Sequence, residues 1–143
     1  MTSIDFYFNA GDRLDVACRL AGKALQQKKR VLIYAPQPEL AQRIDRLLWT
    51  SQAVSFIPHC AAHDALAAET PVLIASDDSV PAHACEVLVN LSADCPPFFE
   101  RHERLLEIVA QDDAERSAGR ARFKFYRDRG YEIRNHDLAK AAS

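Results

Sequence analysis

Apolar positions along the chain switch between two spacings, and this predicts strands that alternate with helices. Short apolar runs suited to buried strands occupy residues 4–8, 30–35, 55–59, 71–76 and 85–92. Between and after them, apolar residues recur three and four positions apart, which predicts helices over 11–29, 38–50, 96–109 and 112–129. This order is typical of an α/β domain with a mainly parallel sheet and helices on both faces.

Local signals support the ends of two of these helices. Asp12 with Asp15, and Asp112 with Glu115, have the spacing of a capping box at a helix N-terminus. Gly130 follows the last helix and suits the left-handed backbone conformation that often ends a helix. The chain is therefore expected to turn sharply after residue 129.

Composition fits one α/β domain spanning residues 1–143. The chain has 143 residues, of which 48% are hydrophobic, enough for a sizeable core. The N-terminus lacks the pattern of a secretory signal, and the apolar runs are too short to span a bilayer, so we expect a cytoplasmic protein without membrane contact. The four cysteines form no C-x-x-C pair and are expected to be free, mostly buried thiols: Cys18, Cys60, Cys85 and Cys95.

The α/β pattern raises the question of a nucleotide, and the glycines argue against one. There are four glycines, and neither G-x-G-x-x-G nor G-x-x-x-x-G-K-[ST] occurs. Without such a loop the backbone cannot approach a diphosphate closely. We therefore expect a Rossmann-like three-layer sandwich without a working nucleotide site and without a cofactor.

Two other groups of residues suggest enzyme chemistry weakly. His59 and His63 have the spacing of zinc ligands on a helix, but Cys60 stands where a metalloprotease has its glutamate, and further ligands are not evident. We expect no metal site there, and the conformation of residues 60–70 is not predicted. Asp77 and Asp78 follow an expected strand, where α/β enzymes place catalytic groups, although adjacent aspartates in a turn usually cap or face solvent.

The strongest signal is a basic and aromatic segment near the C-terminus. The chain has a net charge of −2, yet residues 116–134 hold seven basic and two acidic residues. On a helix, four of these cations follow one stripe: Arg116, Arg120, Lys124 and Arg127. Phe123 and Tyr126 are expected to flank the stripe, and Ala121 and Phe125 to face the core. Such a concentration of charge in an acidic chain predicts an anionic partner at one place.

Three functions remain open from the residues alone. The helix can bind an acidic peptide that ends in an apolar residue, with cations for carboxylates and rings for the end group. It can instead bind single-stranded nucleic acid directly, with rings that stack on bases. An α/β hydrolase or metalloenzyme using the aspartates or histidines named above is the third. The short extent of the patch favours the peptide.

Several segments together resemble the chi subunits of bacterial DNA polymerase III holoenzyme. They are the opening "IDFYF", "KKRVLIYA", "RIDRLLWT", "SFIPH", "PVLIAS" and the C-terminal "GRARFKFYRDRGYEI", in this order over nearly the whole chain. The resemblance implies a non-catalytic accessory subunit with a Rossmann-like fold. It also implies two partners: the psi subunit of the clamp loader, and the acidic C-terminal tail of single-stranded-DNA-binding protein, so that DNA is reached only indirectly.

The resemblance carries a set of peptide-binding residues to this chain. They are Arg120, Phe123, Lys124, Arg127, Gly130 and Tyr131. The family usually has Tyr at the position of Phe123, so the ring is kept and a hydroxyl is lost. For psi, Trp49 at a helix end is one candidate anchor, because aromatics are enriched at interfaces; burial in the core is the alternative.

Overall fold

The computed structural model describes residues 2–50, 58–62, 64–77 and 84–141. Over this part of the chain, seven strands form one sheet in the order β3-β4-β2-β5-β6-β1-β7, and all neighbouring pairs are parallel. The strands are β1 (Ser3–Ala10), β2 (Val31–Tyr34), β3 (His59–Ala61), β4 (Val72–Ala75), β5 (Val87–Asn90), β6 (Arg104–Ala110) and β7 (Ile133–Asp137). The expected α/β class with a parallel sheet is confirmed.

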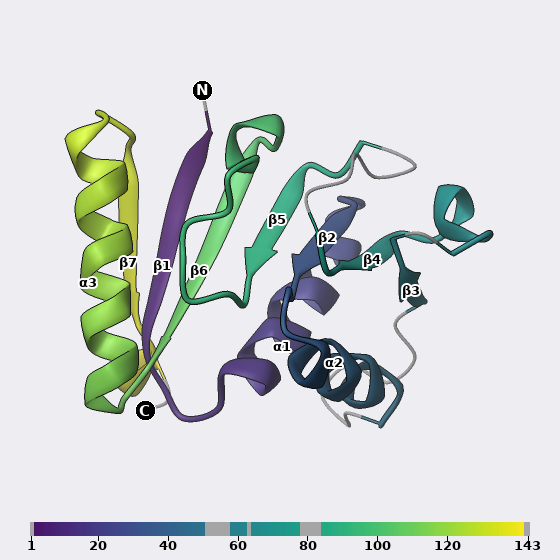
Figure 1. Cartoon of the computed structure of the whole chain (residues 1–143), viewed down its shortest axis with the longest axis horizontal. Helices are drawn as coiled ribbons and strands as arrows, with labels where there is room; N and C mark the ends of the chain where they lie inside the picture. Colours follow the sequence, from purple (N-terminus) through teal and green to yellow (C-terminus); the bar gives the residue numbers. More distant parts are fainter. Residues whose placement is uncertain (1, 51–57, 63, 78–83, 142–143) are drawn as a thin grey trace.

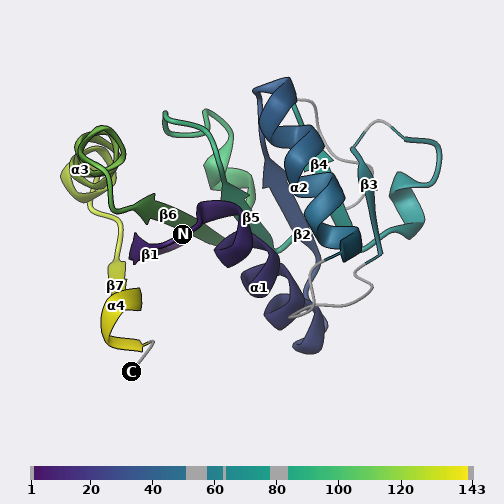
Figure 2. The same cartoon turned by 90° about the horizontal axis from the view of Figure 1, so that it is seen from below.

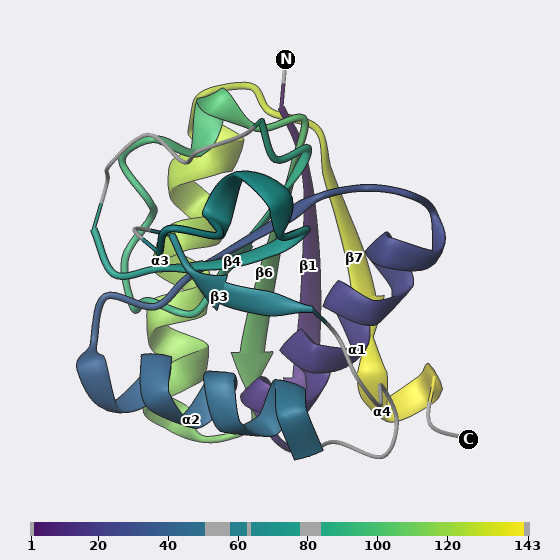
Figure 3. The ribbon, with the colours of Figure 1, turned by 90° about the vertical axis from the view of Figure 1, so that its right-hand side faces the viewer.

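Helices cover both faces of the sheet (Figures 1 and 2). They are α1 (Arg13–Gln26), α2 (Pro38–Thr50), α3 (Asp113–Asp128) and the one-turn α4 (Leu138–Ala141), with short 3-10 turns η2 (Ala67–Glu69) and η3 (Phe99–Arg101). One apolar cluster lies under α1 and α2, and a second, rich in aromatic rings, lies under α3. Figure 3 shows α3 and α1 on opposite sides of the strands. The result is a three-layer sandwich.

Two of the predicted helix ends are confirmed and one cap is not. Asp12 accepts hydrogen bonds from the backbone N–H groups of Leu14 and Asp15, and so caps α1. Gly130 has φ 82°, and the N–H groups of residues 130 and 131 return to carbonyls of the last turn of α3. At the start of α3, however, the Asp112 side chain makes no capping bond, and its expected capping-box partner Glu115 pairs with Arg13.

The predicted helix over 96–109 is wrong. This segment forms the short turn η3 followed by β6, whose five central residues are all buried between the two helix layers. The sequence suggested a helix because Pro96 and Pro97 suit a first helical turn, and because Glu107 breaks the apolar run by which a buried strand is recognised. In the structure Glu107 is fully buried and paired with groups from other elements.

Strand β7 was not predicted, and the segment around residue 59 is shifted. The expected strand 55–59 lies mostly outside the described residues, and β3 covers His59–Ala61, so it begins at the last residue of that expected strand. Strand β7 has the polar sequence "IRNHD" and lies at the edge of the sheet beside β1. A polar edge strand lacks the apolar run by which strands are recognised.

A buried carboxylate holds β7 to its neighbours. Asp5 of β1 is almost fully buried, and its oxygens accept hydrogen bonds from Arg104 (Nη2, 2.9 Å), His136 (Nε2, 3.0 Å) and Arg134 (Nη2, 3.4 Å). The Nε atom of Arg134 also lies 3.1 Å from the carboxylate. Burial alone would raise the pKa of Asp5, but the hydrogen bonds from His136 and Arg104 and the nearby arginine charges outweigh it and lower that pKa.

We expect the Asp5 pairing to make the fold sensitive to acid. A carboxyl whose pKa is lower in the folded state stabilises the fold above its unfolded pKa, and this stabilisation is lost as the pH falls through the folded pKa. Asp5→Asn should therefore lower the free energy of unfolding by about 1–2 kcal/mol at neutral pH and by less below about pH 4. Urea denaturation of both proteins across this range tests it; an equal effect at every pH would contradict the assignment.

Candidate functional site

A cavity of about 410 Å³ lies where α3 crosses the edge of the sheet. Its floor comes from β1 and β6 and its far wall from β7. The lining is mostly apolar on the sheet side and cationic on the helix side, and comprises Phe6, Phe8, Asn9, Val109, Ala110, Arg116, Gly119, Arg120, Phe123 and Asn135. The site thus combines aromatic surface with two exposed guanidinium groups.

The close approach of α3 to β6 depends on Gly119. A Cβ atom at this position would lie 2.7 Å from a methyl group of Val109, closer than non-bonded carbons approach each other. Valine cannot easily turn its methyl groups away, because branching at Cβ restricts χ1. Gly119 therefore lets the helix backbone pack directly onto the strand and sets the depth of the cavity.

We expect Gly119→Val to push α3 away from β6. Overpacking of this kind costs about 1–3 kcal/mol of unfolding free energy. Gly11→Ala is a matched control, because no atom lies within 4 Å of the added methyl group and the backbone there needs no left-handed conformation. Chemical denaturation should show a clear loss for the first variant and almost none for the second. Equal stability of both variants would contradict the packing described here.

A buried polar network fixes the rotation of α3 about its own axis. Arg122 and Tyr126 point from the helix into the sheet, where the Glu107 carboxylate accepts hydrogen bonds from Arg122 Nε (2.9 Å) and the Tyr126 hydroxyl (2.6 Å). Asn90 of β5 donates to both carboxylate oxygens, at 3.0 and 3.1 Å. Because Arg122 and Tyr126 face inward, Arg120 and Phe123 are turned toward the cavity.

The charge states in this network follow from burial and from its hydrogen bonds. Burial raises the pKa of Glu107, while the Arg122 charge and the donated hydrogen bonds act against this shift. All three partners carry hydrogens to donate, which favours the ionised carboxylate. Burial and the adjacent Glu107 also raise the pKa of Tyr126, so its hydroxyl remains a donor.

The structure brings together two of the predicted site residues. Arg120 and Phe123 both line the cavity, and the Phe123 ring packs against the Phe6 ring with centroids 5.3 Å apart. Lys124 and Arg127 are exposed on the outer surface of α3, as expected for residues outside the core. Arg127 lies 3.4 Å from the neighbouring Asp128.

Gly130 and Tyr131 lie at the C-terminal end of α3, beyond the residues that line the cavity. The Tyr131 hydroxyl donates to Glu100 at 2.6 Å, and its ring packs on Phe99 with centroids 5.2 Å apart. Gly130 comes ten positions after Arg120, which corresponds to a rise of about 15 Å along a helix. That Gly130 and Tyr131 bind the same ligand as Arg120 and Phe123 stays a prediction.

Two assignments on the faces of α3 are wrong, and one is confirmed. Tyr126, expected beside the cationic stripe, is fully buried, and its hydroxyl donates a hydrogen bond to Glu107. Ala121, expected in the core, is exposed, and Arg122 takes the inward position beside it. Phe125 packs against the core as predicted, with the Arg129 guanidinium 3.6 Å from its ring centre.

The cavity also uses residues that the sequence did not single out. Phe6 and Phe8 alternate along β1 and so face the same side of the sheet, which is a signal that could have been used. Asn9 has φ 62° at an irregularity in the pairing of β1 with β6, and its side-chain oxygen accepts from Arg116 at 3.4 Å. Asn135 comes from the unpredicted β7, so the sequence held no signal for it.

The other candidate groups do not assemble into a site within the described residues. His59 is buried, with its Nε2 atom 3.1 Å from Asp45 and its ring 4.7 Å from that of Trp49. His63 and Asp78 lie outside the described residues, and Asp77 is exposed. Among the residues described, no group of three potential metal ligands occurs.

All four cysteines are free thiols, as expected, and two of them are buried. Burial raises the pKa of the Cys18 and Cys85 thiols to about 12, so both remain protonated near neutral pH. Cys60 and Cys95 are half-buried. Trp49, by contrast, is 52% exposed, which excludes the alternative that it belongs to the core.

Sequence comparison identifies the family. Residues 1–134 match the family model described as DNA polymerase III chi subunit, HolC. The chain belongs to this family. It is 35% identical to the DNA polymerase III subunit chi of Pseudomonas aeruginosa over 144 residues, covering 98% of this chain and 99% of that protein. The corresponding proteins of Haemophilus influenzae and Escherichia coli are 27% and 28% identical, over 87% and 82% of this chain.

Membership in the family sets the broad class of function and leaves the choice between peptide and nucleic acid open. The chain is an accessory subunit of a replicative DNA polymerase and not its catalytic subunit. In the described part of the structure, no helix has the length and apolar character needed to span a membrane.

Proposed function

We propose that this chi-family chain links the psi subunit of the clamp loader to the acidic C-terminal tail of single-stranded-DNA-binding protein. The observation that supports it best is the α3 cavity, which pairs an aromatic floor with cations at its rim. A peptide that ends in Phe offers the matching chemistry: a ring for the cavity, a terminal carboxylate for a guanidinium, and acidic side chains for the outer surface of α3.

Each proposed contact has a physical basis in the cavity. The terminal ring would pack among Phe6, Phe8 and Phe123, where aromatic pairs gain about 0.5–1.5 kcal/mol beyond the area they bury. Arg120, at the rim, would bind the terminal carboxylate with two parallel N–H donors. Lys124 and Arg127, exposed on the same helix, would attract the acidic residues upstream in the tail.

Direct binding of single-stranded nucleic acid is the second candidate, and the charges on α3 favour it to the same degree. The shape of the site does not. Binders of single strands present rings along a groove where successive bases stack, whereas Phe6 and Phe123 pack edge-to-face with each other within one hollow of about 410 Å³. We therefore expect DNA to be reached through the partner protein.

Titrating the full chain with two fluorescent ligands tests the proposal. One is an acidic peptide ending in Pro-Phe and the other is an oligothymidylate; anisotropy reports both at low salt. We expect saturable binding of the peptide and much weaker binding of the oligonucleotide. Deleting the terminal Phe from the peptide should abolish most of the affinity. Tight oligonucleotide binding with an inert peptide would instead support the second candidate.

The exposed Trp49 is our candidate contact for psi. It lies at the end of α2, and α2 packs at the β3–β4 end of the sheet, whereas α3 covers the β6–β1–β7 end (Figure 1). Two partners at opposite ends of the sheet can be held at once, as a bridging subunit requires. Trp49→Ala should weaken psi binding in calorimetry and leave peptide binding at α3 unchanged; normal psi binding would exclude this contact.

A further inference from the structure

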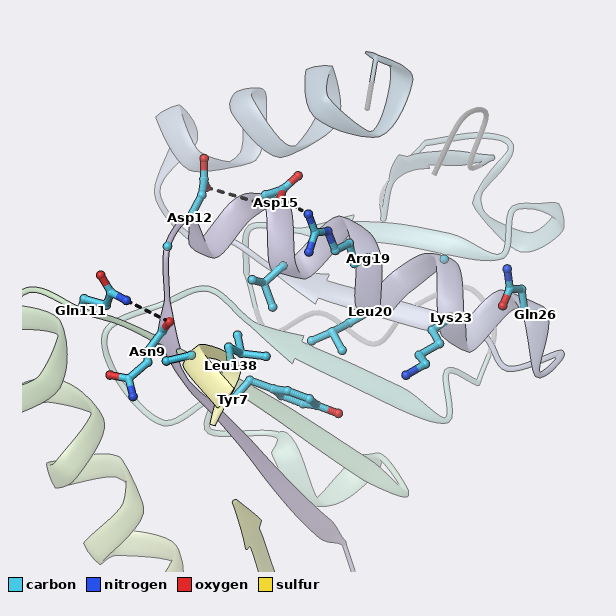
Figure 4. A pocket seen from close by; sticks show the side chains of 14 residues that line it. Tyr7, Asn9, Asp12, Asp15, Arg19, Leu20, Lys23, Gln26, Gln111 and Leu138 are labelled. Carbon is cyan, nitrogen blue, oxygen red and sulfur yellow. Dashed lines mark hydrogen bonds and ion pairs between the residues drawn. The ribbon is translucent and has the colours of Figure 1, made fainter. Parts of the chain in front are cut away.

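A second and larger hollow lies on the opposite face of the sheet from the α3 cavity. It has a volume of about 780 Å³ and runs between α1 on one side and β1 and α4 on the other. Figure 4 shows Leu20 and Lys23 extending from α1 toward Tyr7 of β1, with Leu138 of α4 beside them. We call this hollow the α1 groove. It shares Asn9 with the α3 cavity but faces the other way.

The helix layer on this face is incomplete over β1 and β7. Helix α1 packs on β6, β5 and β2, and α2 packs on β3 and β4. Over β1 and β7 the described chain supplies the four-residue α4 alone. On the opposite face, the 16-residue α3 covers this end of the sheet. One more helix beside α1 would complete the layer.

Helix α1 presents one continuous side to the groove. The α1 residues that line it recur at helical spacing from its N-cap to its last turn: Asp12, Asp15, Val16, Arg19, Leu20, Gly22, Lys23 and Gln26. A helix of 14 residues is about 21 Å long, enough to pack along three to four turns of a neighbour whose axis is about 8–10 Å away.

The floor of the groove is apolar. Tyr7, Val16, Leu20 and Leu138 are partly buried and pack against the core cluster under α1 and α2, while the remaining part of each side chain faces the groove. Apolar surface of this kind gains free energy when a partner covers it. The apolar floor does not by itself indicate which kind of partner binds. The charges at one end of the groove give that information.

The end of the α1 groove beside the last turn of α1, which we call its inner end, is cationic. There a smaller hollow of about 120 Å³ shares Tyr7, Leu20 and Lys23 with the groove and adds Arg104. The buried Nε atom of Arg104 has no hydrogen-bond partner among the described residues. Two arginines, Arg104 and Arg134, face the single carboxylate of Asp5, so the cluster keeps positive charge.

The acidic residues at the outer end are already engaged. Asp12 caps α1, and Asp15 pairs with Arg19 at 3.2 Å. Within the described residues no ion pair includes the exposed Lys23. The Lys23–Arg104 end of the groove is therefore positive, and the negative charge of Asp12 lies at the opposite end of α1.

We propose that the α1 groove binds an amphipathic helix of a partner protein. Its apolar side packs on Tyr7, Leu20 and Leu138, and an Asp or Glu side chain on the same side meets Lys23 and Arg104. This site is independent of the proposed function of the α3 cavity. It gives the chain a further contact that both α3 and the Trp49 surface leave unobstructed.

A selection from random peptides tests the proposal without a known partner. Displayed peptides of about 16 residues, long enough to form a helix on binding, are selected on the Arg120→Ala variant of the full chain, which removes the proposed α3 site. Clones that also bind the Lys23→Glu variant are discarded. We expect the surviving peptides to carry Asp or Glu together with apolar residues three and four positions apart.

Affinities of the selected peptides then locate the site. Lys23→Glu should weaken binding about tenfold or more, Lys23→Arg should restore it, and Arg43→Ala, which removes an exposed arginine of α2 outside the groove, should change it less than about threefold. Lys23 is exposed, so these variants should fold normally. The proposal is overturned if no peptide depends on Lys23, if dependent peptides lack an acidic residue, or if Arg43→Ala is as harmful as Lys23→Glu.

Discussion

Glu107→Gln is expected to lower the free energy of unfolding by about 3–5 kcal/mol, the cost of breaking a buried ion pair by removing one partner. The Arg122 side chain is 3% exposed, and Glu107 is fully buried. With Gln at position 107, the Arg122 charge would remain in the interior without a counterion. The amide –NH₂ would also face the donors of Tyr126 and Asn90, which now bind carboxylate oxygens.

Matched variants separate loss of the charge pair from loss of packing. Tyr126→Phe removes one hydrogen bond to a charged group and should cost about 1.5–3 kcal/mol. Replacing both Glu107 and Arg122 by Met leaves no unpaired charge, so the double variant should be more stable than Glu107→Gln. Urea denaturation monitored by circular dichroism measures all three. A loss below about 1 kcal/mol for Glu107→Gln would show that the network does not hold α3 in place.

Arg120→Ala is expected to weaken binding of the acidic, Phe-ending peptide by about 10- to 150-fold. This corresponds to about 1.5–3 kcal/mol, the range for a hydrogen bond to a charged group. The side chain is exposed and lies outside the core, so the fold should be retained. Lys124→Ala should cost less, because an ammonium group acts as a point charge without the paired donors of a guanidinium.

Two comparisons make the Arg120 result specific. Arg43→Ala removes an exposed arginine from α2, at the other end of the sheet, and should leave the affinity unchanged. Raising the salt concentration should shrink the difference between wild type and Arg120→Ala, because exposed charge pairs are screened. If Arg43→Ala and Arg120→Ala weaken binding equally, general electrostatic attraction explains the result and the cavity does not.

The strands that are buried on both faces and almost entirely apolar were predictable from the sequence. Strands β6 and β7 were missed, because their charged residues pair with side chains far away along the chain. Strands β2, β4 and β5 are buried on both faces and are apolar except for Asn90 at the end of β5 and the Tyr34 hydroxyl at the end of β2, so the sequence reveals them directly. Strand β6 is equally buried, but Glu107 within it is neutralised by Arg122, which lies 15 residues further along the chain. Strand β7 is polar because it lies at an edge and pairs its charges with Asp5.

The candidate site divides in the same way. Arg116, Arg120 and Phe123 share one side of a helix, so their spacing predicts that they lie together, and the cavity contains all three. Phe8, Asn9 and Asn135 reach the cavity only because β1 lies beside β7 beneath α3. The sequence also contained no sign that Arg122 and Tyr126 point into the sheet. A cation and a hydroxyl suggest an exposed helix face unless it is known that Glu107 lies opposite them.

The most direct test of the account is to map the Phe-ending acidic peptide onto isotope-labelled protein by NMR. The account predicts that backbone amide shifts change most at Gly119, Arg120 and Phe123 and at Asn135 across the cavity, and that they fail to change when the terminal Phe is removed. Shifts that centre on α2 around Trp49 or on the α1 groove, with the α3 cavity unaffected, would contradict it.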